Sequence, residues 1–298
     1  MRPDTLVTHS GGFHADELLS SVVLTRLYPE ARILRTRDTD QITPAAGRII
    51  YDVGGDYDPD RAIFDHHQRE APLREDGAPY SSFGLIWKHY GHAYLRALDV
   101  PEDHLEKVHA SVDARLVLPV DLADNGAVDP SEAGPMGALT LPALLETLTP
   151  VFDQSSPAAL DAAFATALDV ARHFVEARVA QAAAKLRAVA LAREAVAAAG
   201  TSRILELPMG MPYRSAVTEA GADHLLFVVT PREDSWTLGG IRAHDTGFEL
   251  RADLPQAWAG LSGAALEEAS GVQGATFCHK ARFIAAARTR EAVMQMAE

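Results

Sequence analysis

The sequence predicts an α/β protein: a parallel-sheet domain at the N-terminus, a long helical connector and a smaller α/β domain at the C-terminus. Short apolar runs alternate with a helical pattern over residues 5–55, one alanine-rich helical pattern fills 157–199, and mixed strand and helix patterns return after Gly200. At 298 residues and 47% hydrophobic composition, the chain can bury the cores of two domains. We predict boundaries at 1–150, 151–200 and 201–298.

Three apolar runs bounded by turn residues predict the first strands: "TLVTH" at 5–9, "ARILRT" at 31–36 and "GRIIYDVGG" at 47–55. Residues 16–28 between the first two runs place leucines and valines at helical spacing. The order strand, helix, strand favours a parallel sheet, in which functional residues gather at the carboxyl ends of the strands. His9 and Asp52 lie at two such ends.

Helical patterns also cover residues 81–97 and 102–118, and the longest covers 157–199, where apolar side chains recur every three or four positions until Gly200. At 1.5 Å per residue this helix approaches ~60 Å, which is too long for one compact domain. We expect it to connect two domains or to pack against a second subunit, and therefore predict a homo-oligomer, such as a dimer.

After Gly200, the runs "SRILEL", "HLLFVVTP" and "SWTLGGIRAH" predict strands, and "PQAWAGLSGAALEEAS" predicts a loop followed by a helix. These patterns predict the smaller α/β domain of the C-terminal hundred residues.

The chain carries a net charge of −14, so any nucleic acid must be bound by a local basic surface. The N-terminus lacks the layout of a signal peptide, and no apolar stretch is long enough for a membrane span. Cys278 is the single cysteine, which excludes an internal disulfide. These features predict a soluble, cytoplasmic protein without a membrane partner.

Potential metal ligands follow several apolar runs of the first half. Because the carboxyl ends of parallel strands meet at one edge of a sheet, we expect these side chains to converge there. They form four groups: His9, His14 and Asp16 in "THSGGFHADE"; Asp52 in "YDVGG"; Asp65, His66 and His67 in "FDHH"; and Asp121 and Asp124 in "PVDLADNG".

Charge balance indicates that such a cluster holds metal. Carboxylates crowded in a partly dry cleft repel one another unless they are protonated or neutralised. Two divalent cations against Asp16, Asp52 and Asp121 leave roughly one positive charge, which suits a phosphate. Mixed imidazole and carboxylate ligands favour manganese, iron, cobalt or zinc over calcium. We therefore predict a dinuclear metal site.

Four segments together resemble the melanocyte-proliferating-gene (Myg) family, a branch of the DHH phosphoesterase superfamily: "THSGGFHADE", "YDVGGDYDPDRAIFDHHQR", "VDLADNG" and "FCHKARFIAAARTREAVMQMA". The resemblance covers nearly the whole chain. It implies two α/β domains with a cleft between them, two Mn²⁺ ions per subunit and hydrolysis of phosphoester or phosphoanhydride bonds. For the Myg branch it implies 3′ to 5′ exonuclease activity on RNA.

Carried over by position, the resemblance implies particular roles. One metal would be held by His9 and His14 and the other by Asp16 and His66, with Asp52 bridging the two. Asp121 would complete the second metal's ligands, with Asp124 as a rival. His67 and Asp65 would serve catalysis, His67 by facing the substrate and Asp65 by holding a histidine. Most of the superfamily has aspartate where this chain has His14.

Residues 271–290 contain no acidic residue, so this segment carries positive charge although the chain as a whole is acidic. We interpret this segment as a phosphate-binding lip across the cleft from the metals; the alternative is a helix with a solvated basic face, or a subunit contact. For Phe277 and Phe283 we favour core packing over base stacking. The substrate-binding candidates are His279, Lys280, Arg282, Arg288 and Arg290, followed by Arg242 and His244 in "GGIRAH".

These patterns favour a metal-dependent exonuclease that acts on short single-stranded RNA or DNA through a metal-activated water. One alternative is a small-molecule phosphohydrolase acting on pyrophosphate, phosphoadenosine phosphate or a cyclic dinucleotide. Another is a regulatory dimer that binds metal or nucleotide without turnover.

Overall fold

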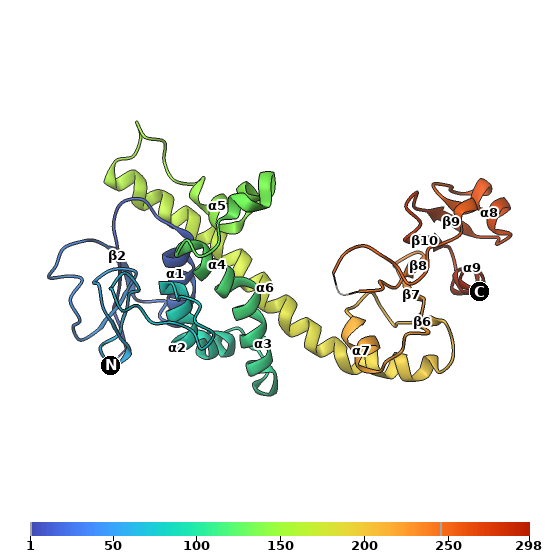
Figure 1. The fold of residues 1–298 in the computed structure, drawn as a ribbon, viewed down its shortest axis with the longest axis horizontal. Coiled ribbons are helices and arrows are strands. Elements are labelled where there is room, and N and C mark those ends of the chain that lie inside the picture. The colour runs from blue at the N-terminus through green and yellow to red at the C-terminus, as the bar shows by residue number, and fades with distance from the viewer. Residues whose placement is uncertain (1, 245) are drawn as a thin grey trace. The chain divides into compact units, whose positions relative to one another are not determined.

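The computed structural model describes residues 2–244 and 246–298. The chain divides into two compact units, Met1–Ala183 and Ala184–Glu298. The division falls within helix α6 (Pro157–Ala199), coloured yellow-green to yellow in Figure 1. The helix predicted over 157–199 is therefore confirmed. None of the helices in the described part of the chain combines the length and apolar character needed to cross a bilayer.

The first unit contains a five-stranded sheet in the order β2-β1-β3-β5-β4. Strand β1 pairs in parallel with β2 and β3, β5 pairs in parallel with β3, and only the short edge strand β4 runs antiparallel. The predicted parallel sheet is confirmed, and its first three strands are the predicted ones. The strands are β1 (Thr5–Thr8), β2 (Arg32–Arg35), β3 (Arg48–Tyr51), β4 (Tyr57–Asp58) and β5 (Ile63–Phe64).

The register of this sheet brings three chain segments to one edge. Val7 of β1 pairs with Ile50 of β3, and Ile50 pairs with Ile63 of β5. These apolar side chains are buried together, which holds the register because a one-residue slip would turn them to the other face. The residues that follow the three strands, His9, Asp52 and Asp65, therefore come out at the same edge.

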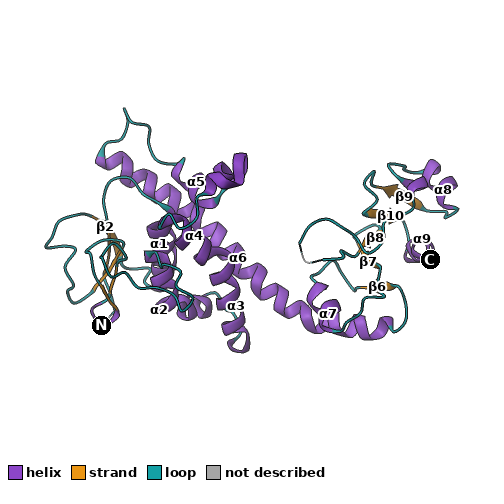
Figure 2. Ribbon diagram, in the orientation of Figure 1, coloured by secondary structure: helices purple, strands orange, loops and turns teal. Residues whose placement is uncertain are grey.

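Helices make up most of the rest of the first unit (Figure 2). Helix α1 packs along α2, burying an apolar face that includes Leu18, Leu19 and Trp87. The prediction of a helix over 102–118 is too short, since helical structure continues through a π-helical turn at Asp113–Val117 to Asp124. The helices are α1 (Ala15–Leu27), α2 (Ser82–Ala97), α3 (Leu105–Val112), α4 (Leu118–Asp124) and α5 (Leu141–Glu146).

The second unit is built on another five-stranded sheet, in the order β6-β7-β8-β10-β9. Strands β6 and β7 are parallel and the other neighbours antiparallel. The smaller α/β domain is confirmed, with helices α7 (Arg214–Glu219), α8 (Ala264–Ser270) and α9 (Arg290–Ala297). Its strands are β6 (Ile204–Glu206), β7 (Phe227–Pro231), β8 (Trp236–Gly240), β9 (Ala275–Cys278) and β10 (Ile284–Ala287).

Apart from Arg290, where α9 begins, residues 271–290 do not form a helix, so the alternative of a helix with a solvated basic face is wrong, while the alternative of a subunit contact stays a prediction. The segment forms β9, β10 and the turn between them, and Arg282 in this turn has a positive φ of 58°. The buried alanines of β10, Ala285 and Ala287, pack in the core with Leu238 and Val293, and burial alternates along the strand as expected when one face covers the core.

Candidate metal centre

Potential metal ligands of the first unit meet at the edge where β1, β3 and β5 end. Four overlapping groups have ligand atoms within 4.8 Å of one another. Together they contain every predicted ligand except Asp121, and they add Glu17. The groups are Asp52, Asp65, His66 and His67; His9, His14 and Glu17; Asp16, His66 and Asp124; and Asp16, Glu17 and Asp52.

Asp52 lies at the centre of this arrangement, directly after β3 and buried. Its Oδ2 atom is 3.1 Å from His9 Nε2, and its Oδ1 atom is 3.5 Å from His66 Nε2. The two oxygens therefore face different histidines on different sides of the carboxylate. Asp52 has a positive φ of 54°, a conformation that a non-glycine residue adopts only when its surroundings enforce it. The backbone is thus held in a costly conformation that aims this carboxylate into the cluster.

The first side of the cluster comes from the β1–α1 loop. His9 follows β1, His14 is the N-cap of α1, and Glu17 lies in the first turn of that helix. Both Glu17 carboxylate oxygens accept hydrogen bonds from the His14 backbone N–H at 3.0 Å, and Oε1 lies 3.2 Å from His9 Nε2. Sequence reasoning missed Glu17, because an acidic residue three positions after an N-cap is the ordinary signature of helix capping. The feature that distinguishes Glu17 from an ordinary capping residue is its complete burial, which the sequence does not show.

The second side combines Asp16, His66 and Asp124. His66 Nε2 lies 3.3 Å from Asp124 Oδ2 and 4.0 Å from Asp16 Oδ2. On the other edge of its ring, His66 Nδ1 lies 3.3 Å from Asn125 Oδ1. The Asn125 amide donates to the backbone oxygens of Tyr80 and Asp121, so its oxygen is the atom turned toward His66. Asn125 therefore keeps the His66 proton on Nδ1 and leaves the Nε2 lone pair facing the carboxylates.

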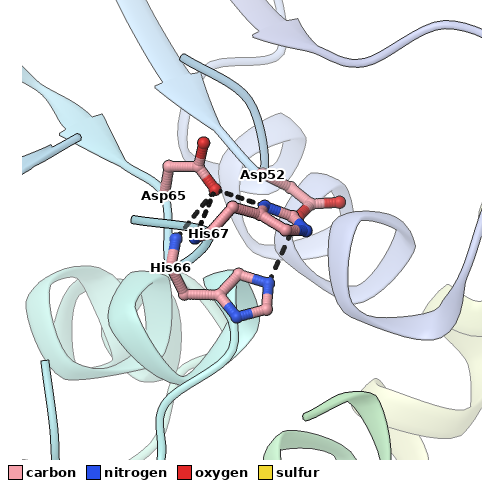
Figure 3. Close-up of side chains that lie close together, drawn as sticks. All are labelled: Asp52, Asp65, His66 and His67. Atoms are coloured by element: carbon pink, nitrogen blue, oxygen red, sulfur yellow. Dashed lines mark hydrogen bonds and ion pairs between the residues drawn. The ribbon is translucent and has the colours of Figure 1, made fainter. Parts of the chain in front are cut away.

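Asp65 organises the two adjacent histidines (Figure 3). Its Oδ1 atom accepts from the backbone N–H groups of His66 and His67 and lies 2.7 Å from His67 Nδ1. Its other oxygen accepts from the Gly55 N–H at 2.6 Å. The His67 side chain is 62% exposed, in contrast to the buried His66. One carboxylate thus fixes the course of the loop and orients an accessible imidazole.

Asp121 and Asp124 lie on helix α4 and not at the end of a strand, contrary to the expected placement. The buried Asp121 carboxylate accepts from Ser81 and from the Gly84 N–H, and it forms an ion pair of 2.6 Å with Arg74. Burial raises its pKa to about 6, against the opposing effect of Arg74. Asp121 therefore joins α2, α4 and the preceding loop, while Asp124, one helical turn later, faces His66.

The pKa values of the cluster reflect the close approach of several buried carboxylates. Burial and the charges of Asp52, Asp124 and Glu17 raise the pKa of Asp16 well above its usual range. For Asp52, burial is outweighed by the nearby imidazoles of His66 and His9, which lower its pKa to about 2. For His9, burial is likewise outweighed, by Asp52 and Glu17, and its pKa rises to about 10. The protein without metal thus relies on protons to offset the carboxylate charge.

The cluster fits bound metal ions on structural grounds. Both Asp16 carboxylate oxygens and His66 Nε2 are buried and have no hydrogen-bond partner in the described part of the chain. Orphaned buried acceptors are costly, and a cation coordinated by them removes that cost. The donors are imidazole nitrogens and carboxylate oxygens without a thiolate, a set that suits manganese, iron, cobalt or zinc.

A cavity of about 850 Å³ opens onto the cluster, lined by residues of the first unit. His9, His14, Asp52, Asp124 and His67 face it. Among the described residues that line it, Arg37 is the only arginine or lysine. Its Nε–H donates to the Ser10 carbonyl oxygen, next to His9. Among the described lining residues, the site thus has one permanent cation beside many potential metal ligands.

The predicted substrate-binding residues all lie in the second unit, and several of them have other partners. Arg282 pairs with Asp253 at 2.7 Å, and Arg290 binds both oxygens of Glu206 at 2.6 Å. His244 lies 3.9 Å from Glu249, and Arg242 donates to the Gly247 carbonyl oxygen. Lys280 and Arg288 are exposed, and His279 lies in the β9–β10 turn beside Phe283.

The preference for core packing of Phe277 and Phe283 is wrong, because each ring is 44% exposed. Phe277 lies on the outward face of an edge strand, and Phe283 precedes β10, so neither ring reaches the core. Both rings lie close to His279, at 6.3 and 4.5 Å between ring centroids.

Comparison with known proteins agrees with the resemblance stated from the motifs. The human protein named MYG1 exonuclease is 33% identical over 324 residues, covering 100% of this chain and 85% of that protein. A MYG1 protein of Schizosaccharomyces pombe is 33% identical over 315 residues, covering 98% and 95%. A crystal structure of RecJ in complex with Mn²⁺ from Thermus thermophilus aligns with 13% identity over 98% of this chain and 51% of that one, but at a TM-score of 0.29 it supports no inference. The model of the family described as "Uncharacterised protein family (UPF0160)", the MYG1 exonuclease family, matches residues 5–298, and this chain belongs to that family.

Proposed function

We propose that this protein is a metal-dependent exonuclease that hydrolyses short single-stranded RNA, or DNA, from the 3′ end, using two Mn²⁺ ions in each protomer. The observation that carries the proposal is Asp52, whose two oxygens face His9 on one side and His66 on the other at 3.1 and 3.5 Å. A carboxylate between two sets of ligands suits a pair of ions that share a bridging ligand.

The same geometry supports two ligand sets. His9 and His14 would hold the first ion, Asp16, His66 and Asp124 would hold the second, and Asp52 would serve both. Asp121 is left out because Ser81, Gly84 and Arg74 already occupy its carboxylate. Glu17 lies 3.2 Å from His9 and would add negative charge beside the first ion.

The revised set of carboxylates changes the charge balance. Asp16, Glu17, Asp52 and Asp124 together carry four negative charges when ionised, which two divalent ions neutralise. No surplus positive charge remains for a phosphate, in contrast to the sequence-based count. The protein must supply it, and Arg37 at the cavity wall is one such cation.

When bound, the two ions would lower the pKa of a water shared between them and stabilise charge on the phosphoryl oxygens. The chain contributes the positioning. The hydrogen bond with Asp65 raises the pKa of His67, which favours the protonated ring, and this exposed ring can donate to a phosphate oxygen. Asn125 holds His66 in the tautomer that presents Nε2 to the metal side.

Residues of the second unit would bind the substrate strand. His279, Lys280 and Arg288 form no ion pair within the described part of the chain, whereas Arg282 and Arg290 are engaged with carboxylates. The exposed rings of Phe277 and Phe283 offer surfaces on which bases can stack. Because stacking tolerates any base, a sequence-independent exonuclease is the activity this surface supports.

Incubation with Mn²⁺ and RNA oligomers labelled at the 5′ end tests the proposal. We expect a ladder of products shortened from the 3′ end, with release of mononucleotides. His66→Ala should abolish it, and His173→Ala, which changes a histidine of α6 outside the cluster, should leave it intact. No shortening by the metal-loaded wild type on either RNA or DNA contradicts the proposal.

A small-molecule phosphohydrolase is the second candidate. It is favoured because Arg37 is the one arginine or lysine among the described residues of the cavity wall, and one cation suits one phosphate group. Release of inorganic phosphate from pyrophosphate, or of nucleotide from a cyclic dinucleotide, without shortening of oligomers selects this candidate. Tight binding of an oligomer without any product selects a regulatory role.

A further inference from the structure

A basic cavity of about 360 Å³ lies in the second unit, between helix α7 and the segment that follows β8. Three guanidinium groups line it, from Arg214, Arg242 and Arg251, and the imidazole of His244 lies beside them. Asp223 is the only acidic residue among the described residues that line it. This concentration of positive charge stands out in a chain with a net charge of −14.

The three arginines are held to different degrees. Arg251 is fixed by the carbonyl oxygens of Ala222 and Leu225 and by Asp223 at 3.1 Å. Arg242 donates from Nη1 to the Gly247 carbonyl oxygen, and its other N–H groups have no partner among the described residues. The side chain of Arg214 makes no hydrogen bond or ion pair within the described residues.

The charges of these arginines act at a common point. Burial raises the pKa of Tyr213, and Arg214, Arg242 and Arg251 all oppose this rise. Three like charges close to one side chain repel one another, so the arrangement costs free energy that an anion in the cavity would offset. Guanidinium groups bind phosphate oxygens with paired, directional hydrogen bonds, which makes a phosphate the anion that this geometry fits.

An exposed aromatic ring borders the arginines. The Phe248 ring is 88% exposed, and the Arg242 guanidinium carbon lies 5.2 Å from its centroid. This exposed ring beside the basic cavity offers a surface on which a nucleotide base can stack.

We propose that this cavity binds a nucleoside phosphate, with the phosphate on Arg214 and Arg242, Arg251 completing the positive wall, and the base stacked on Phe248. The inference rests on the proposed function, because it makes the ligand either one nucleotide of the single-stranded substrate or a free mononucleotide. The volume of about 360 Å³ lies within the range of about 300–1,000 Å³ typical of small-molecule sites. The cavity is separate from residues 271–290, on which the sequence-based prediction of phosphate binding concentrated.

The test is equilibrium binding to the full chain with EDTA present, so that hydrolysis does not interfere. A fluorescent single-stranded RNA hexanucleotide is titrated by anisotropy between about 50 and 200 mM salt. For Arg214→Gln/Arg242→Gln we expect roughly tenfold or greater loss of affinity at low salt. The slope of log affinity against log salt should flatten by about 0.7, since the two arginines contact one phosphate and each phosphate contact to a single strand contributes about 0.7.

Phe248→Ala separates stacking from charge, because it should weaken binding by about tenfold without changing the salt slope. Arg232→Gln is the matched control, since Arg232 is an arginine of the β7–β8 turn that does not line the cavity. Thermal melting checks the fold of each variant. If the double variant is unstable, Arg214→Gln alone replaces it in the binding test, because the Arg214 side chain has no partner among the described residues.

Competition experiments identify the source of the ligand. Displacement of the hexanucleotide by AMP assigns the cavity to a free mononucleotide, and displacement only by unlabelled oligomer assigns it to a strand; both support the proposal. Wild-type affinity and salt slope in a folded arginine variant overturn it. If inorganic phosphate competes as well as AMP, the base-stacking role of Phe248 is wrong. Failure of the exonuclease proposal is distinct, because it appears as intact binding without Mn²⁺-dependent shortening.

Discussion

The ligand cluster of the first unit and the basic segment of the second unit were both predicted from motifs. In the structure the predicted ligands lie close together, whereas two of the predicted arginines pair with nearby carboxylates. The histidines and carboxylates around Asp52 do converge, because short side chains at the ends of paired strands must follow the backbone. The arginines at 282 and 290 turn to Asp253 and Glu206, while a more concentrated set of arginines lies around Arg214. Long, flexible cations find nearby carboxylates that a linear sequence does not reveal.

The largest expected effect comes from Asp52→Asn. The side chain keeps its size but loses the charge shared between the two proposed ions, which removes several kcal/mol of stabilisation. We expect kcat/KM for RNA hydrolysis to fall roughly 1,000-fold. Metal content measured after dialysis should fall from two ions per protomer toward one or none.

Asp60→Asn is the control for this substitution, because Asp60 is an exposed aspartate of the same segment outside the cluster. Equal activity and equal metal content in Asp52→Asn and wild type would mean that the convergence of these side chains has no catalytic meaning.

The pair Asp121→Asn and Asp124→Asn sharpens the comparison within α4. Asp121→Asn puts an amide where two backbone N–H groups and Arg74 need an acceptor, and it should lower the free energy of unfolding by about 3 kcal/mol. Asp124→Asn should leave stability of the metal-free protein unchanged or increased, since it relieves carboxylate crowding, and should reduce Mn²⁺ affinity. Chemical denaturation measures the stability of each variant, and metal titration measures its Mn²⁺ affinity. If Asp121→Asn lost Mn²⁺ affinity and Asp124→Asn lost stability, Asp121 would be the ligand.

Asn125→Ala tests the positioning of His66. Without the Asn125 oxygen, His66 no longer has a partner that keeps its proton on Nδ1, and Mn²⁺ affinity should fall about 10- to 100-fold. Asn125→Asp retains an acceptor at this position and should recover part of the affinity. Isothermal titration of both variants gives the comparison, and equal loss in both would indicate that only packing was disturbed.

The smallest expected effect is a pH dependence of the metal-free protein. The pKa of His9 is raised in the folded state from 6.5 to about 10, so its contribution to stability is present below pH 6.5 and is lost as the pH rises through about 10. We expect the free energy of unfolding to fall by roughly 1 kcal/mol across this window, because the neighbouring carboxylates share the compensating protons. Urea denaturation with EDTA measures it, and His9→Gln should flatten the profile.

The fold was largely predictable because its main signals are local. Apolar runs at 5–9, 31–36 and 47–55 specify strands, and the regular spacing over 157–199 specifies one helix, which the structure contains as α6. The ending of the helix predicted over 102–118 was missed because a π-helical turn shifts the pattern, and Pro119 lies in the first turn of the next helix, where proline is tolerated. The basic segment was ambiguous because the consecutive alanines of β10 give weak strand and helix signals alike.

The sequence alone determined which chain segments bear the potential metal ligands, since His9, Asp52 and Asp65 each come directly after a strand and the order of strands requires a parallel sheet. Only the tertiary structure separated Asp124 from Asp121, added Glu17 to the cluster and gathered Arg214, Arg242 and Arg251 around one cavity. The physical reason is that burial and partnership depend on segments far apart in the chain. A carboxylate becomes an ion-pair partner, a helix cap or a metal ligand according to what the fold places within about 4 Å of it.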